Sequence, residues 1–304
     1  MTMENTPPPK PQRSFLKSFF RFSAGLFALI VLLAIGSAFL PDRWKIPKGD
    51  IALIHIQGML MDSRDIVRQL SSYRHHPGVR GILLRIDSPG GAVAPAQEIY
   101  SEVMKLRDEN ITVFASLGTV AASGGYYIAS ATDYIIANPG TLTGSISAVM
   151  AFNNVEELAA KIGVRPNVIK SGKFKDMGSP LRAMKPEERK LLQNVVDDVH
   201  QQFVQAVAIG RGLPISEVSL IADGRIMTGQ QALQLRLVDE LGGLEKTIEL
   251  LAKKIGVSGR PKVIEEKDKT PFLDWLLQSS ISSKLVKTLM PSPLPGLQYI
   301  WNPL

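Results

Sequence analysis

The segment VAASGGYYIAS, residues 120–130, places a single serine, Ser123, directly before two glycines and an apolar stretch. A serine hydroxyl acts as a nucleophile when a base takes its proton and hydrogen-bond donors stabilise the negative charge that develops. Gly124 and Gly125 have no side chains, so a substrate backbone can come close and the Gly124 N–H is free to donate. The alternative is a serine that caps the following helix, a common role for serine.

A second glycine-rich turn, DSPGG at residues 87–91, follows a predicted strand. Glycines in such a turn leave backbone N–H groups unshielded, and an oxyanion hole needs N–H groups aimed at a developing negative charge. An ordinary turn between a strand and a helix would have the same composition. If the turn lies beside Ser123, it can supply the donors that nucleophilic catalysis requires.

Histidine is the usual base for a serine nucleophile, but the histidines of this chain are poorly placed for that role. They lie in an apolar strand pattern, in a polar turn and in a long helix, and open α/β sheets place their chemistry in loops at strand ends. These residues are His55, His75, His76 and His200. A histidine base is therefore not predicted.

A lysine can replace histidine if burial favours its neutral form. The segment KSGKFKDMGSP, residues 170–180, follows a predicted strand and contains Lys170, Lys173 and Lys175. Each of these lysines can also be a solvated surface charge, and their spacing does not identify one of them as the base.

Apolar runs of strand length alternate with helical patterns in the middle of the chain. We expect strands at 51–56, 81–86, 111–116, 133–139 and 164–172. We expect helices at 61–73, 94–108, directly after Ser123, at 186–212 and at 224–243. Alternation of this kind predicts an α/β fold with a largely parallel sheet covered by helices on both faces.

The N-terminal region contains 19 uncharged residues, 22–40, after four basic residues. As a helix this segment would be about 28 Å long, close to the thickness of the bilayer hydrocarbon. The basic flank predicts a cytoplasmic N-terminus, which places the residues after Pro41 outside the cytoplasm. A cleaved signal peptide is the alternative, because Gly36-Ser37-Ala38 loosely resembles a cleavage site; a buried soluble helix is a third interpretation.

The composition excludes several classes of protein. The chain of 304 residues has no cysteine, so disulfides, thiolate zinc sites and a cysteine nucleophile are ruled out. The formal net charge is +7, but the basic residues form no stripe interleaved with aromatic residues, and no nucleic-acid partner is predicted. We predict no cofactor and no metal site.

Five motifs together resemble the signal peptide peptidase A family, in its short single-domain form. They are AASGGYY, DSPGG, TGSI at residues 143–146, KSGKFKDMGSP and TGQQALQLRLVDELGG. The similarity extends from about residue 48 to 257. It implies the Clp-peptidase/crotonase-like fold, with repeated β-β-α units and a largely parallel sheet, preceded by one N-terminal transmembrane helix.

The resemblance also assigns roles to individual residues. Ser123 corresponds to the nucleophile, Lys175 to the general base and Ser145 to the serine that orients that lysine. The backbone N–H groups of Gly90 and Gly124 correspond to the oxyanion donors, and Gly91 is a possible donor in place of Gly90.

The function implied is that of a membrane-anchored serine endopeptidase with a Ser-Lys dyad. Its substrates would be remnant signal peptides and other membrane-associated peptides outside the cytoplasm, at the bacterial inner membrane. The family forms ring-like homo-oligomers in which the serine of one subunit meets the lysine of its neighbour. The alternatives are a related protease that cleaves membrane proteins, a crotonase-type acyl-CoA enzyme, and a scaffold without catalytic activity.

These interpretations divide the chain into five parts. They are a basic leader (1–21), an anchor (22–40), a tether (41–49), a protease domain (50–257) and a C-terminal extension (258–304). In the extension, residues 271–290 have the pattern of an amphipathic helix. That helix is expected either to pack on the protein itself or a neighbouring subunit, or to dock on the membrane surface.

Overall fold

The computed structural model describes residues 49–266 and 298–300, together with residues 23, 25–27 and 29. By its internal contacts the chain forms two units, 1–47 and 48–304. The predicted anchor, apart from those five helical positions, and the predicted amphipathic helix 271–290 lie outside the described residues. Within the described ranges, every helix is too short or too polar to span a bilayer.

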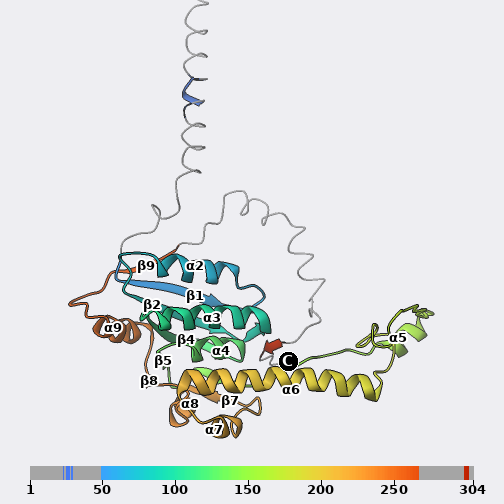
Figure 1. The fold of residues 1–304 in the computed structure, drawn as a ribbon. Coiled ribbons are helices and arrows are strands. Elements are labelled where there is room, and N and C mark those ends of the chain that lie inside the picture. Colours follow the sequence, from blue (N-terminus) through green and yellow to red (C-terminus); the bar gives the residue numbers. More distant parts are fainter. Residues whose placement is uncertain (1–22, 24, 28, 30–48, 267–297, 301–304) are drawn as a thin grey trace, which may run out of the picture. The chain divides into compact units, whose positions relative to one another are not determined.

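An eight-stranded sheet lies at the centre of the second unit (Figure 1). The strands run in the order β7-β6-β4-β2-β1-β9, and β5 pairs with both β4 and β8. Neighbouring strands are parallel except for β6 and β7. The strands are β1 Ile51–Gln57, β2 Gly81–Ser88, β4 Thr112–Ala122, β5 Tyr134–Ala137, β6 Leu142–Gly144, β7 Ile226–Thr228, β8 Glu240–Leu241 and β9 Val263–Glu265. The prediction of a largely parallel α/β sheet is confirmed.

Two short strands form a separate antiparallel pair: β3, Gly90–Ala92, and β10, Gln298–Ile300. Because β3 directly follows β2 and precedes a helix, this part of the chain is a β-β-α unit. β10 comes from the C-terminal part of the chain, more than 200 residues after its partner. The two strands therefore join distant parts of the sequence.

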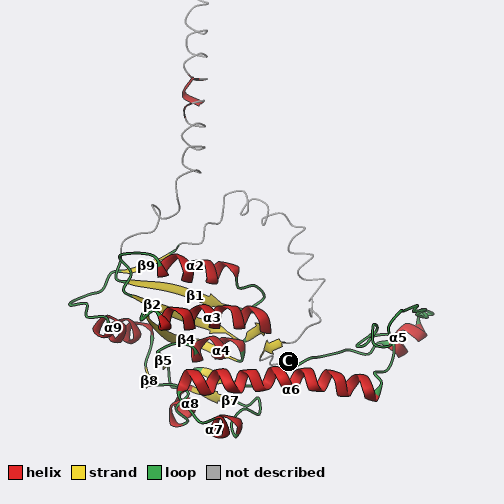
Figure 2. Cartoon of the chain, viewed as in Figure 1, coloured by secondary structure: helices red, strands yellow, loops and turns green. Residues whose placement is uncertain are grey.

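Helices lie between most of the strands along the chain, and α5, α6 and α7 follow one another without a strand between them (Figure 2). They are α2 Arg64–Arg74, α3 Val93–Asp108, α4 Gly124–Ser130, α5 Glu156–Lys161, α6 Pro186–Arg211, α7 Ile215–Ser219, α8 Gly229–Gln234 and α9 Leu244–Lys254. Helix α5 and the N-terminal end of α6 lie away from the sheet (Figure 1). The connection between them contains the lysine-rich segment.

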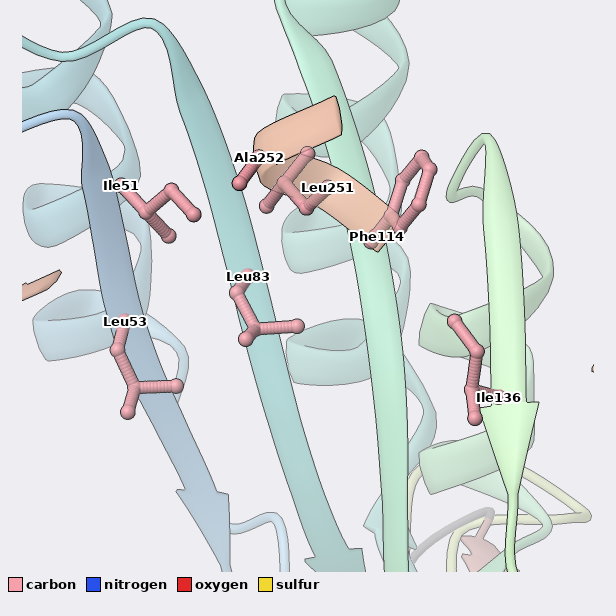
Figure 3. Close-up of a cluster of buried hydrophobic side chains, with 7 residues drawn as sticks. All are labelled: Ile51, Leu53, Leu83, Phe114, Ile136, Leu251 and Ala252. Atoms are coloured by element: carbon pink, nitrogen blue, oxygen red, sulfur yellow. The ribbon is translucent and has the colours of Figure 1, made fainter. Parts of the chain in front are cut away.

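The core continues on both faces of the central strands because alternate side chains of a strand point to opposite faces. On one face, side chains from four strands pack against α9 (Figure 3). The residues of this cluster are Ile51, Leu53, Leu83, Phe114, Ile136, Leu251 and Ala252. The intervening residues, such as Ile54 and Leu84, are also fully buried, which explains the nearly continuous apolar runs in the sequence.

The prediction of a strand at 164–172 is wrong, because these residues form no strand. Val168 and Ile169 are 55% and 96% exposed, so the apolar side chains of this segment are not buried against a core in the described part of the chain. An apolar alternation specifies a strand only where a neighbouring strand pairs with it and one of its faces is buried.

The single helix predicted at 224–243 is also wrong, because this region contains β7, α8 and β8. Strand β7 pairs antiparallel with β6. Thr228 then begins α8 through a capping box with Gln231. The helix ends before Arg236, whose φ is 60°, a conformation that no α-helix contains. The pairing of β7 with β6 and the Thr228 cap of α8 therefore divide a sequence pattern that is typical of a single helix.

Candidate active site

Ser123 stands at the junction between the end of β4 and the start of α4. Its φ is 53°, a strained value for a residue with a side chain. The residue is fully buried, and its Oγ has no hydrogen-bond partner in the part of the chain that the structure describes. The hydroxyl makes no capping bond to α4. Helix capping, the alternative role for this serine, is therefore not its role in this structure.

Strand β6 brings a second serine next to this junction. The Ser123 N–H donates to the carbonyl oxygen of Gly144 at 2.9 Å. Ser145 follows directly, with a φ of 52° and 6% of its surface exposed. Its own N–H donates to the carbonyl oxygen of Arg225 at 2.8 Å. Parallel pairing of β4 and β6 therefore places the two predicted site serines on neighbouring chain segments.

The DSPGG turn connects β2 to β3 and is held by Ser88, a residue that sequence reasoning missed. The Ser88 hydroxyl donates to the carbonyl oxygen of Gly58 at 2.6 Å and accepts from the Gly90 N–H at 3.2 Å. Ser88 is fully buried and pairs with Ala121 of β4, two residues before Ser123. The sequence feature that could have indicated this role is a serine directly before Pro-Gly-Gly.

The backbone direction of β3 distinguishes the two glycines of this turn. The Gly90 carbonyl accepts from the Leu60 N–H at 2.8 Å, and the Ala92 N–H donates to the Leu60 carbonyl at 2.7 Å. Because successive residues of a strand direct their polar groups to opposite edges, the Gly91 N–H points away from Leu60. A β-carbon placed on Gly124 would lie 3.4 Å from the Gly91 nitrogen. The DSPGG turn and the Ser123 turn thus come together.

The predicted lysines lie on the segment between α5 and α6, and all three are exposed or partly exposed. Lys170 forms an ion pair with Asp176, and Lys173 forms one with Glu187. Lys175 has no ionic partner among the described residues. Since the Ser123 Oγ has no partner either, the structure does not join Ser123 and Lys175 within one chain.

The residue after Lys175 is tied to α6 through a network of charges. The Asp176 carboxylate accepts from Arg182 Nε at 3.0 Å. Arg182 also donates to both oxygens of Glu188 at 2.9 and 2.6 Å, and Glu188 is almost fully buried. Hydrogen bonds from Arg182 hold the pKa of Asp176 well below its usual range and lower the pKa of Glu188 to about 2. This network fixes the backbone next to Lys175.

A parallel α/β sheet with a serine in a strained turn between a strand and a helix is an arrangement found in hydrolases that use a serine nucleophile. Comparison with known proteins agrees with this class. Residues 105–258, slightly more than half of the chain, match the model of peptidase family S49, and the chain belongs to that family. The matched range includes Ser123, Ser145 and Lys175.

Several curated proteins are similar to this chain. A Synechocystis protein provisionally named a protease is 50% identical over 58% of this chain and 63% of its own length. An Enterococcus faecium protein provisionally named signal peptide peptidase SppA is 36% identical over 70% of this chain and 62% of its own. Protease 4 of Salmonella typhi is 30% identical over 81% of this chain and 42% of its own length. Each alignment covers less than two thirds of the relative.

Proposed function

We propose that this chain is a serine endopeptidase in which Ser123 is the nucleophile and Lys175 of a neighbouring copy is the base. The observation that carries the proposal is the buried Ser123 hydroxyl, which stands on a strained backbone and has no hydrogen-bond partner among the described residues. A buried hydroxyl without a partner is costly, and such costs are concentrated at functional sites. Membership of peptidase family S49 supports the reaction class.

In this reaction Lys175 Nζ takes the Ser123 proton while Oγ attacks a peptide carbonyl carbon. The N–H groups of Gly124 and Gly91 stabilise the negative oxygen. Gly91 is favoured over Gly90 because the Gly90 N–H already donates to Ser88. The C–N bond then breaks, and the lysine gives its proton to the leaving amine. Water, deprotonated by the same lysine, releases the acid from the acyl-enzyme. Ser145 accepts a hydrogen bond from the ammonium group and keeps it directed at Ser123.

Supply of the lysine by a second copy explains two features of the segment that contains it. Lys175 lies on the connection between α5 and α6, and apolar side chains of α5 and of this connection are exposed, including Leu158, Ile162 and Ile169. Large exposed apolar patches mark interaction surfaces. A closed ring of copies buries such a surface and excludes water from the site, and burial favours the neutral form of a lysine.

The substrates proposed are peptides, with remnant signal peptides first among them because the Enterococcus relative bears that name. The membrane anchor at residues 22–40 belongs to the same proposal and rests on the apolar sequence. Membrane extraction of the full chain and of a chain lacking these residues tests it: the full chain should need detergent, and the shortened chain should not.

A fluorophosphonate probe tests the catalytic assignment. Such probes react covalently with an activated serine, so the wild-type chain should be labelled and Ser123→Ala should not. Ser130→Ala is the matched control, because Ser130 lies at the other end of α4 and hydrogen-bonds locally to the Tyr127 carbonyl. Equal labelling of wild type and Ser123→Ala would disprove the assignment of the nucleophile.

A further inference from the structure

A pocket of about 740 Å³ lies at the opposite end of the sheet from the candidate active site. It is formed where β4 and β5 begin, beside the last turns of α3 and α9. Strand β4 has 11 residues and runs from Thr112 at this pocket to Ala122, directly before Ser123. At about 3.3 Å per residue, the strand keeps the pocket about 33 Å from Ser123. In Figure 1, α9 accordingly lies at one end of the sheet and the red arrow of β10 at the other.

The inner wall of the pocket is apolar. Phe114 and Tyr134 stack there, with 5.2 Å between ring centroids and 28° between ring planes. The Tyr134 hydroxyl donates to Glu240 Oε2 at 3.2 Å, which holds the ring in place. Leu250 of α9 also lines the pocket. Concave sites of this volume with aromatic and aliphatic walls are typical of ligand-binding pockets.

The outer rim of the pocket carries positive charge. Lys253 and Lys254, in the last turn of α9, are exposed and have no ionic partner in the described part of the chain. Arg107 lines the pocket as well, but its charge is offset by Asp133, which accepts from Arg107 Nε at 2.9 Å. The free charge of the pocket is therefore that of the two lysines. An apolar wall beside two free cations fits a ligand with an apolar part and a negatively charged group.

A small anion by itself is not the ligand that this pocket favours. The C-terminal ends of α3 and α9 both lie at the pocket, and the C-terminal end of a helix carries partial negative charge. Lysines in a last turn stabilise their own helix for the same reason, so their presence alone does not indicate a site. The ligand must also gain from contact with the stacked rings and Leu250. This requirement points to an amphiphile.

The chain from the proposed membrane anchor enters the sheet at the same edge. Ile51, Gly81 and Thr112 are partners on three neighbouring strands. Strands lie about 4.8 Å apart, so Ile51 is about 10 Å from Thr112. The ten residues 41–50, between the proposed anchor and β1, span at most about 36 Å when fully extended. An anchored chain therefore keeps the edge that carries the pocket within that distance of a bilayer surface.

We propose that this pocket binds an anionic phospholipid of the membrane surface. The lipid phosphate pairs with Lys253 and Lys254. The upper part of the acyl chains contacts the stacked rings and Leu250. The choice of a lipid rests on the membrane anchor proposed above and not on the peptidase reaction. Binding here holds Ser123 about 33 Å from the bilayer surface, so a peptide must leave the membrane before it is cleaved.

Hydrogen exchange of the full chain, measured by mass spectrometry in the presence of vesicles, tests the site locally. Vesicles of dioleoylphosphatidylcholine are compared with vesicles that also contain dioleoylphosphatidylglycerol. Exchange in residues 107–112 and 250–256 should slow about fivefold or more with the anionic vesicles only, because each cation near an anionic surface contributes about that factor to binding. Equal exchange with the two kinds of vesicle would overturn the proposal.

Substitution of the two lysines tests their role. Lys253→Gln/Lys254→Gln should lose the slowed exchange. Lys161→Gln/Lys190→Gln is the matched control, because it removes the same charge from exposed positions of α5 and α6, and it should behave as the wild type. All four lysines are exposed, so circular dichroism should show intact folds. Slowed exchange that survives in Lys253→Gln/Lys254→Gln, or that is lost equally in both variants, would contradict a specific site.

Ligands without acyl chains distinguish a lipid from a free anion. Inorganic phosphate and glycerol 3-phosphate carry the charged group alone and should leave exchange at the pocket unchanged. Slowing by either one that equals the effect of the anionic vesicles would overturn the lipid assignment.

The same measurements separate this site from the other proposals. A full chain that shows the lipid effect but is extracted from membranes without detergent would keep the pocket and refute only the anchor. A chain that shows the effect but cleaves no peptide would keep the pocket and refute only the peptidase function.

Discussion

The amide of Ser123 donates a 2.9 Å hydrogen bond to the carbonyl oxygen of Gly144, the residue directly before Ser145. This bond continues the parallel pairing of β4 and β6 by one residue, to the point where both strands end. Both serines have a positive φ. The proposed nucleophile and the residue proposed to orient its base are thus held by one backbone interaction.

Ser145→Ala should lower kcat about tenfold to a hundredfold without abolishing hydrolysis, because it removes an orienting hydrogen bond and leaves the base in place. Steady-state kinetics on a fluorogenic peptide measure the effect. Ser147→Ala, two residues further along the same segment, is the control and should retain wild-type kinetics. Unchanged kcat in Ser145→Ala would remove this residue from the site.

Lys175→Ala should reduce peptide hydrolysis by about a thousandfold or more, since the proposed base of the nucleophilic serine is lost. Lys173→Ala should keep most of the activity, because its ammonium group pairs with the exposed Glu187. Initial rates of the two purified variants, with oligomeric state checked by light scattering, decide between these lysines. An inactive Lys173→Ala beside an active Lys175→Ala would reverse the assignment.

Mixing two inactive variants tests whether the site is shared between copies. Ser123→Ala subunits keep Lys175, and Lys175→Ala subunits keep Ser123, so the proposed ring, if it contains both variants, would have some interfaces with both groups intact. Part of the wild-type rate should return after the two chains are dissociated and reassembled together. Rings that contain both variants, shown by native mass spectrometry, and that remain inactive would place both groups in one chain.

Ser88→Ala should lower the free energy of unfolding by about 1–3 kcal/mol, because the Gly58 carbonyl and the Gly90 N–H lose a buried partner. Chemical denaturation followed by circular dichroism measures this change. Activity should fall as well, since the DSPGG turn is held by this side chain. Ser101→Ala, at an exposed position of α3, is the control and should be neutral.

The network around Arg182 predicts that the segment before α6 loosens in acid. The folded-state pKa of Glu188 is about 2, below its usual 4.5, and that of Asp176 is also lowered. Carboxylates with lowered pKa values stabilise the folded state above their usual pKa, and this contribution is lost as the pH falls from about 4.5 towards 2. Hydrogen exchange in residues 150–185 should therefore increase between pH 5 and pH 3.

Arg182→Met should produce the same increase in hydrogen exchange already at pH 7, because both carboxylates lose their partner. Arg182→Lys keeps a positive charge but not the two-pronged geometry and should fall between this variant and the wild type. Protection that is the same at pH 5 and pH 3 in the wild type would show that these ion pairs do not hold the segment.

Much of this architecture followed from local pattern. Continuous apolar runs predicted the central parallel strands, because a strand buried on both faces has no polar alternation. Helix α3 lies within one residue of its predicted bounds, and α6 ends one residue earlier than predicted. Glycine-rich turns after two of these strands indicated where backbone groups come close to one another.

Tertiary structure decided what depends on partners distant in the sequence. The alternation at residues 164–172 resembles a strand, but no strand among the described residues pairs with it, and Ile169 is left exposed. The preference for Gly91 over Gly90 as the proposed oxyanion donor rests on the Gly90 N–H, which donates to Ser88 across the β2–β3 turn. Tyr299 lies beside Gly90 and Gly124 because β10 pairs with β3, a strand more than 200 residues earlier in the sequence. The sequence by itself determined which types of residue could react, because the chemistry resides in side chains and in glycine-rich turns. The tertiary structure determined which of these residues meet, because backbone pairing and burial act between segments that are far apart in the sequence.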